Sequence, residues 1–340
     1  MSRAARRCYL PFMRAAPLAL LLPLLVPLAC GGSSQTSGFE GGGGGSSSGG
    51  GSSSGGSGSG GLLGDSGTGG SSSGGGSGCS GQATDFVYVL SAQNDLYSFA
   101  PNRQQFTKIG PLQCATSMQP NSMAIDRNAD AYVNYVQSDQ TTGTDTAGAV
   151  YKVSTRDGSC SPQPVLTLPS GWYRIGMGYS TDSTGGNAET LYVDGVGNGM
   201  AGTGSGLGLV DFGKGAVGPI GPFSGSLAGV AAELTGTGDG RLFGFFTTRP
   251  VYVAQITKTS GATPTPVPMT GVQTPQDWAF SFWGGHFYLY TSQGQLGSGG
   301  SDVTDYDPAT GAIDTSYMMS IGFDIVGAGV STCAPTVAPQ

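Results

Sequence analysis

The chain has 340 residues, of which 63 are glycine and only 10% are charged. Four of its 14 basic residues precede Cys30, and without that segment 10 basic and 21 acidic residues leave a net charge of −11. Binding to phosphate groups needs clustered positive charge, so this balance argues against nucleic acid or an anionic membrane surface as a partner. The excess of acidic residues favours solubility of a glycine-rich chain.

Residues 1–29 have the pattern of a secretory signal peptide, with an arginine-rich start and an apolar stretch containing three prolines. That stretch is too short for a membrane-spanning helix of about 20 residues. Residues 27–31, Pro-Leu-Ala-Cys-Gly, resemble the lipobox of bacterial lipoproteins, with Pro27 where that family usually has leucine. The resemblance implies that Cys30 becomes the lipid-bearing first residue, and that Gly31 directs the protein to the outer membrane. An ordinary signal peptide that leaves Cys30 unpaired is the alternative.

Residues 30–82 read as a tether made almost entirely of glycine and serine. Such a composition cannot bury apolar surface, so we expect the tether to be disordered. A flexible chain of this length has an end-to-end distance of about 40 Å. It would hold the following domain away from the membrane to which the lipid on Cys30 attaches it.

The remaining residues, 83–340, contain a repeat of about 50 residues, which is typical of propeller blades. In each unit a small-apolar strand, a polar turn and an aromatic strand precede a further strand that ends in a tight turn. In four of the five units a glycine stands five residues after the anchor of that strand; the five anchors are Phe99, Val153, Val210, Ile256 and Tyr306. We therefore predict an all-β propeller of five four-stranded blades, with six blades as the alternative.

The first repeat unit lacks its innermost strand. Its segment 85–92 matches the second strand of the other units, and the missing inner strand is found in 323–333. Pairing of the two terminal strands would close the ring and remove the free sheet edges.

Four cysteines of the folded part allow three disulfide pairings. Cys79 precedes the first strand and Cys333 follows the last, so a bond between them would clamp the seam of the ring. Cys114 and Cys160 would then remain, although the expected strand order puts them near opposite ends of a blade. An even number of cysteines suits an oxidising compartment.

Several phrases of the folded part are similar to those of a group of uncharacterised bacterial lipoproteins with Gly/Ser tethers: "SMAIDR" (122–127), "LTGTGDGRLFGFF" (234–246), "AFSFWGG" (279–285) and "VGAGVSTCAP" (326–335). The resemblance covers nearly the whole folded part. It implies a β-propeller-like domain on a lipid anchor and implies no activity.

Two motifs of nucleophilic, metal or nucleotide chemistry are weak. His286 is the only histidine, and it stands at the start of a strand without neighbouring ligands, so we expect a solvent-facing strand residue. Residues 197–202 match G-x-G-x-x-G, but further glycines and a strand follow instead of the helix that a dinucleotide site requires. We expect no cofactor.

Calcium motifs are equally weak. Asp126 starts a segment that resembles an EF-hand loop, but Ala131 and Gln137 occupy its sixth and twelfth positions, which require glycine and glutamate. We expect Asp126 to close a turn with its side chain. The loop 182–189 is the remaining calcium candidate.

Three carboxylates, Asp126, Glu233 and Asp277, lie at or near predicted inner strands. Five-bladed propeller glycosidases use acidic residues in the central channel as acid, base and pKa modulator, so these three are candidates for a hydrolase site. Turn formation is the simpler expectation for residues at strand ends. Four aromatic residues could stack on a sugar, although core packing is the stronger expectation: Trp172, Tyr173, Trp278 and Trp283.

The sequence favours a monomeric lipoprotein of the cell envelope whose propeller is a non-catalytic binding or scaffold module. Three absences favour this over an enzyme, since the chain lacks a second histidine, a metal constellation and a nucleophile motif. An envelope protein or a polysaccharide is the expected partner. The alternative is a carbohydrate-active hydrolase that uses the channel carboxylates.

Overall fold

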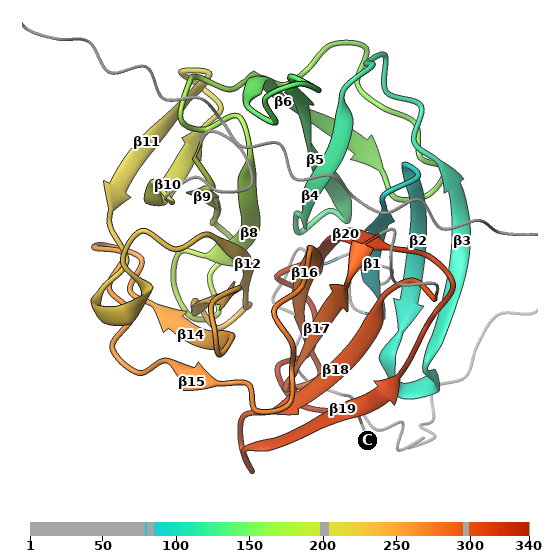
Figure 1. Cartoon of the computed structure of the whole chain (residues 1–340), viewed down its shortest axis with the longest axis vertical. Helices are drawn as coiled ribbons and strands as arrows, with labels where there is room; N and C mark the ends of the chain where they lie inside the picture. The colour runs from blue at the N-terminus through green and yellow to red at the C-terminus, as the bar shows by residue number, and fades with distance from the viewer. Residues whose placement is uncertain (1–78, 80–84, 198–203, 295–298, 340) are drawn as a thin grey trace, which may run out of the picture. The chain divides into compact units, whose positions relative to one another are not determined.

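The protein is described by a computed structural model that covers Cys79 and residues 85–197, 204–294 and 299–339. These residues form a ring of five four-stranded antiparallel sheets, a five-bladed β-propeller (Figure 1). The prediction of five blades is confirmed and six blades are excluded. None of the described residues belongs to a helix long and apolar enough to cross a membrane. The expected signal peptide and tether lie outside the described residues.

The strands of each blade are given from the innermost to the outermost. Blade A contains β20 (Ile325–Gly329), β1 (Val87–Ser91), β2 (Asp95–Ala100) and β3 (Gln105–Pro111). Blade B contains β4 (Gln119–Ile125), β5 (Asp130–Ser138), β6 (Asp145–Ser154) and β7 (Leu166–Thr167). Blade C contains β8 (Ile175–Thr181), β9 (Glu189–Gly195), β10 (Gly206–Asp211) and β11 (Ala216–Gly221). Blade D contains β12 (Ala232–Gly236), β13 (Leu242–Phe246), β14 (Tyr252–Ile256) and β15 (Val267–Pro268). Blade E contains β16 (Asp277–Trp283), β17 (His286–Ser292), β18 (Asp302–Asp307) and β19 (Ala312–Met318).

The two ends of the domain close the ring as predicted. The last strand, β20, pairs antiparallel with β1, and Tyr88 lies opposite Gly329. A disulfide joins Cys79, before β1, to Cys333, after β20. Blade A is therefore held by both its hydrogen bonds and a covalent bond between distant parts of the chain.

The repeated glycine of the sequence marks one backbone position in each blade. Four turns between the third and fourth strands contain a glycine with φ between 60° and 78°, a left-handed conformation that favours glycine; these residues are Gly158, Gly215, Gly261 and Gly311. Blade A has Gln104 at the same place with φ of 51°. The turn geometry is therefore kept in all five blades even where the glycine is absent.

Five hydrophobic clusters hold the blades together, one between each pair of neighbouring sheets. Side chains of a strand alternate between its two faces, so each sheet contributes to the cluster on either side. Between blades A and B, for example, Leu90 and Leu96 pack with Met123, Val133 and Tyr135. This packing explains why the strands are apolar on both faces.

The inner strands approach one another closely because glycines stand at their contacts. A Cβ atom placed on Gly176 of β8 would lie 1.9 Å from the carbonyl oxygen of Ala232 on β12. One placed on Gly327 of β20 would lie 2.9 Å from the backbone nitrogen of Met123 on β4. A small space on the axis is lined by Ala124 of β4, Gly178 of β8 and residues of β12 and β20, and it has no room for a water molecule. The centre of the propeller is thus a packed core.

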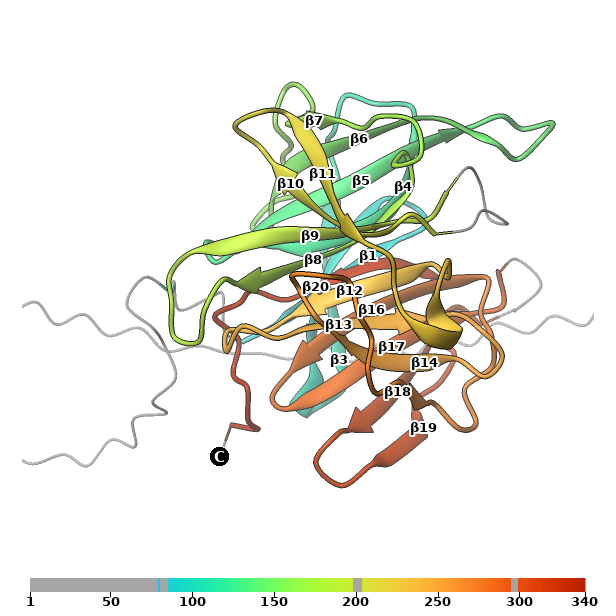
Figure 2. The ribbon, with the colours of Figure 1, turned by 90° about the vertical axis from the view of Figure 1, so that its left-hand side faces the viewer.

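All five inner strands start at the same face of the ring, which we call the mouth face. Figure 2 shows the ring from the side, with the β5–β6 hairpin extending from the mouth face and the C-terminus at the opposite face. Cys333 follows the end of β20, so the Cys79–Cys333 bond lies on the side opposite the mouth.

The second disulfide joins Cys114 to Cys160, which makes the expected separation of these residues wrong. Cys114 follows the outer strand of blade A, whereas Cys160 follows β6 of blade B. Each strand is rotated by roughly 20–25° relative to its neighbour, so an outer strand lies at a large angle to the inner strand. The end of blade A therefore meets the outer turn of blade B, where Gln113 donates to the carbonyl of Gly158 at 3.0 Å.

Replacing Gly176 by alanine should destabilise the propeller by about 1–3 kcal/mol, because β8 and β12 would have to move apart. The control is Gly218→Ala on β11, where a Cβ atom would meet only the Leu209 side chain at 3.8 Å. The free energy of unfolding in urea measures both. A G176A protein as stable as G218A would contradict the packed axis.

Removing the Cys79–Cys333 disulfide should lower the free energy of unfolding more than removing the Cys114–Cys160 disulfide does. In the chain-entropy account, the 254-residue separation of Cys79 and Cys333 corresponds to about 5 kcal/mol. The 46-residue separation of Cys114 and Cys160 corresponds to about 4 kcal/mol. Urea unfolding of the C79S/C333S and C114S/C160S proteins checks this order, and a reversed order would count against ring closure by the seam bond.

Candidate functional site

The three carboxylates predicted for a hydrolase do not come together. Asp126 follows the end of β4 at the face opposite the mouth, where its Oδ1 accepts hydrogen bonds from the backbone N–H groups of Asn128 and Asp130, both at 2.9 Å. This is the turn that the sequence predicts for Asp126. Glu233 and Asp277 instead lie near the starts of β12 and β16, on the mouth side.

Glu233 is enclosed at the centre of the ring. Its side chain is 5% exposed, and its Oε2 accepts a hydrogen bond from the Ser122 hydroxyl of β4 at 2.8 Å. The backbone N–H of Met177 on β8 also binds the carboxyl group. Burial raises the pKa of Glu233 well above its usual value.

A second buried acid lies beside Glu233. Asp194 on β9 is fully buried, and its Oδ2 accepts a hydrogen bond from the backbone N–H of Ala232 at 2.6 Å. Burial raises the pKa of Asp194 well above its usual value. Both acids therefore bind their protons more tightly than an exposed carboxyl group does, and both accept hydrogen bonds inside the ring.

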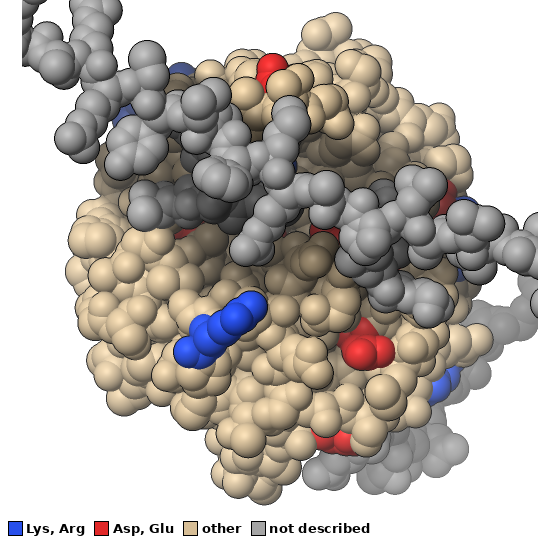
Figure 3. Space-filling model, in the orientation of Figure 1, with Lys and Arg blue, Asp and Glu red and all other residues tan. Residues whose placement is uncertain are grey.

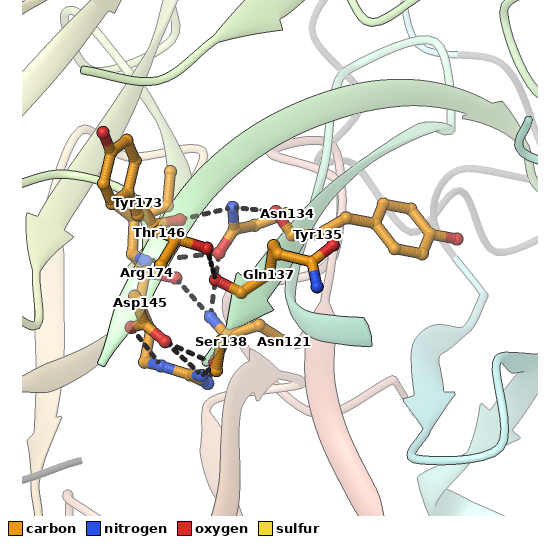
Figure 4. Close-up of polar contacts among 10 residues, drawn as sticks. Asn121, Asn134, Tyr135, Gln137, Ser138, Asp145, Thr146, Tyr173 and Arg174 are labelled. Atoms are coloured by element: carbon orange, nitrogen blue, oxygen red, sulfur yellow. Dashed lines mark hydrogen bonds and ion pairs between the residues drawn. The ribbon is translucent and has the colours of Figure 1, made fainter. Parts of the chain in front are cut away.

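The mouth contains a polar network centred on Arg174, which immediately precedes β8 (Figure 4). Its Nε and Nη2 atoms contact the two carboxylate oxygens of Asp145 at 3.0 and 3.1 Å. Its Nη1 donates to Asn121 at 2.6 Å, and the Asn121 amide donates to Asn134 at 2.9 Å. Ser138 donates to Asp145 at 2.6 Å. Because the Asp145 side chain has no exposed surface, this ion pair fixes the base of the β5–β6 hairpin to blade C.

Two further carboxylates come from blades E and A. Burial raises the pKa of Asp277, the negative charge of Asp324 raises it further, and the positive charge of Arg174 opposes both. A hydrogen bond with the Ser292 side chain also lowers the pKa of Asp277, so this carboxyl group is subject to both charges and to a local hydrogen bond. The Oδ1 atom of Asp324 is buried and accepts no hydrogen bond within the described part of the chain.

Figure 3 shows the mouth face as a mostly uncharged surface that is hollowed toward the centre of the ring where grey atoms do not cover it. The charged groups of the mouth come from different blades, with Arg174 preceding β8 and Asp277 starting β16. The site can hold a polar ligand in place through hydrogen bonds and charge.

The four aromatic residues proposed for sugar stacking pack within the blades. Trp172 and Tyr173 pack against the cluster between blades B and C, whereas Trp278 packs between blades D and E. Trp283 is 5% exposed in the cluster between blades E and A. Core packing is their main role, and they do not form one surface.

The remaining motifs do not assemble a site among the described residues. The Nδ1 atom of His286 lies 2.9 Å from Asp305 on the neighbouring strand, at a partly exposed position. In the calcium candidate loop, Asp182 accepts from Thr190, while Glu189 accepts from the backbone of Arg127. No cluster of three metal-ligating side chains occurs in the part of the chain that the structure describes. Most of the 197–202 motif, and Cys30, lie outside it.

Sequence reasoning missed Arg174, Asp145, Asn121 and Asp324. Each residue lies directly before a strand or among its first three residues. A polar residue at the start of a strand is the sequence signal that could have identified them. Arg174 was also recognisable as one of few positive charges in a chain that is 10% charged.

Replacing Arg174 by methionine should destabilise the protein by about 2–4 kcal/mol, because the Asp145 carboxylate would stay buried without its partner. Adding Asp145→Asn should recover part of that loss. Lys214→Met, which breaks the exposed Lys214–Asp211 pair, is the control and should leave the stability unchanged. Urea unfolding measures all four proteins, and equal effects of R174M and K214M would contradict a structural role for the network.

No protein-family model matches the chain, and no curated protein does. Among solved structures, a gluconolactonase from Xanthomonas campestris is 14% identical, with a TM-score of 0.37 over 61% of this chain and 68% of that chain. A second solved structure, described as a putative gluconolactonase, is 12% identical, with a TM-score of 0.36 over 61% of this chain and 70% of that chain. Similarity at this level assigns no reaction to this protein.

Proposed function

We propose that the propeller is a non-catalytic binding module of the cell envelope and that its mouth face holds the ligand. The observation that carries this proposal is the closure of the channel beneath the mouth. Glu233 is 5% exposed and bonded to Ser122, and Asp194 is fully buried, so neither deep carboxyl group is open to a substrate.

A hydrolase would need a general acid and a base that both reach the substrate. Asp126 is engaged in a turn at the opposite face, and Glu233 is enclosed between three strands. Of the three residues predicted for that role, only Asp277 stands where a ligand could meet it. The geometry therefore favours binding over hydrolysis.

The mouth has the features of a rigid binding surface. Arg174, Asp145 and Asn121 hold one another in position before any ligand arrives, which lowers the entropic cost of binding. The loops at one end of a propeller are free to vary without disturbing the blades, which makes them natural recognition surfaces.

The location belongs to the same proposal. Two disulfides are typical of an oxidising, non-cytoplasmic compartment. We propose that lipid on Cys30 anchors the protein to the outer membrane and that residues 30–82 are the tether.

A thermal-shift screen with peptidoglycan fragments, envelope polysaccharides, calcium and a chelator tests this function. A ligand present at 100 times its Kd should stabilise the folded state by about 2.7 kcal/mol and raise the midpoint by about 5–10 °C. The D277N/D324N protein should lose the shift, whereas D211N, altered at an outer turn of blade C, should keep it.

The same panel distinguishes the hydrolase alternative, for which the raised pKa of Asp277 beside Asp324 is the supporting observation. Release of reducing sugar from a polysaccharide, abolished in D277N with the fold intact, would overturn the non-catalytic proposal. A shift without turnover supports it.

A further inference from the structure

We propose that the Ser122–Glu233 bridge is a pH-sensitive latch, which keeps the channel closed while Glu233 is protonated and opens it when Glu233 ionises. This inference concerns the interior of the ring and does not depend on the proposed function of the mouth.

The bridge joins strands that are not neighbours in the ring. Along the axis, β8 lies between β4, which carries Ser122, and β12, which carries Glu233. The Glu233 carboxyl group also takes the backbone N–H of Met177 on β8. One side chain thus ties the inner strands of three successive blades at the top of the channel.

The surroundings of the bridge would leave an ionised Glu233 carboxylate without hydrating water. Ser122 is fully buried and Glu233 is 5% exposed. On one side, Gly176 allows β8 to lie against the backbone of Ala232 and Glu233. A charge placed here would lack hydration, and a buried charge without a compensating partner is strongly unfavourable. Ionisation therefore favours any state in which water enters between these strands.

The charged groups around the bridge do not compensate a negative Glu233. The nearest is Asp194 on β9, whose charge raises the pKa of Glu233. Asp277 on β16 and Asp324 before β20 are also acidic, and β13 carries no charged residue. Arg174, which precedes β8, is paired with Asp145. Two further titratable groups lie toward the opposite face, Tyr179 on β8 and Asp126, which directly follows β4.

The sign of the pH dependence follows from these contacts. Glu233 binds its proton more tightly in the folded state than in the unfolded chain, where the pKa is about 4.5. The stabilising contribution of the protonated group is complete below that value and is lost as the pH rises toward the folded-state pKa. Raising the pH should therefore loosen the three strands before the whole domain unfolds.

Hydrogen exchange of the full protein tests the latch, measured on residues 175–181 and 232–236 between pH 6 and pH 10 and corrected for the intrinsic rate. In the wild type we expect the corrected exchange of these strands to rise up to tenfold per pH unit while the pH lies between the pKa of Glu233 in the opened state and its raised pKa in the folded state, and to level off above the latter. Glu233→Gln keeps the shape and the acceptor for Ser122 but cannot ionise, so its corrected exchange should stay flat. Asp277→Asn, the control at the mouth, should respond as the wild type does.

Ser122→Ala gives a second, independent readout, because it removes the hydrogen bond while Glu233 remains. Faster corrected exchange of the same strands at pH 6 is expected if the bridge holds the channel closed. A pH response of Glu233→Gln equal to that of the wild type would overturn the proposal. A Ser122→Ala protein whose exchange at pH 6 equals that of the wild type would also overturn it. This second measurement decides the matter by itself if the Glu233→Gln protein fails to fold.

Discussion

The structure depends on the close approach of five inner strands to one axis. A small ring of sheets leaves little space at its centre, and side chains larger than hydrogen at the contact positions would separate neighbouring blades. Gly176, Gly178 and Gly236 allow the contact between β8 and β12, and Gly327 and Gly329 allow that between β20 and β4. Once the inner strands touch, the aromatic and branched side chains of the outer strands fill the wedges between blades, where they form five separate clusters.

This packing decides where chemistry is available. Carboxyl groups that reach the axis are shielded from water, so burial raises the pKa of Glu233 and of Asp194, and their value to the fold lies in the hydrogen bonds they accept. Groups that reach a ligand are confined to the rim of the ring. There the sparse charges of the chain meet, because the starts of five inner strands converge on one face: Arg174 from blade C pairs with Asp145 from blade B, and both Arg174 and Asp324 from blade A act on Asp277 from blade E.

The candidate site could be predicted only in part. The repeat places Glu233 and Asp277 at the starts of inner strands, but the same reading groups them with Asp126, which stands at the other end of β4. Strand order along the chain tells which residues begin or end a strand, whereas contacts across the axis join residues such as Ser122 and Glu233, which are 111 positions apart. No local pattern marks such a pair. The pairing of Cys114 with Cys160, which remains once Cys79 pairs with Cys333, is found in the structure. The expected separation of these two residues was wrong for a related reason, since the twist of each blade is a property of the assembled sheet.

By itself, the amino-acid sequence determined the class of the fold and the closure of the ring, and it favoured five blades over six, because these follow from a repeat period, strand alternation and the displaced inner strand of blade A. It also determined the turns, since a left-handed residue is required five positions after each anchor. Only the tertiary structure decided that the channel is closed, that Glu233 lies inside it and that Arg174 organises the mouth. Those features arise from the distances between blades, which depend on how all five sheets pack at once.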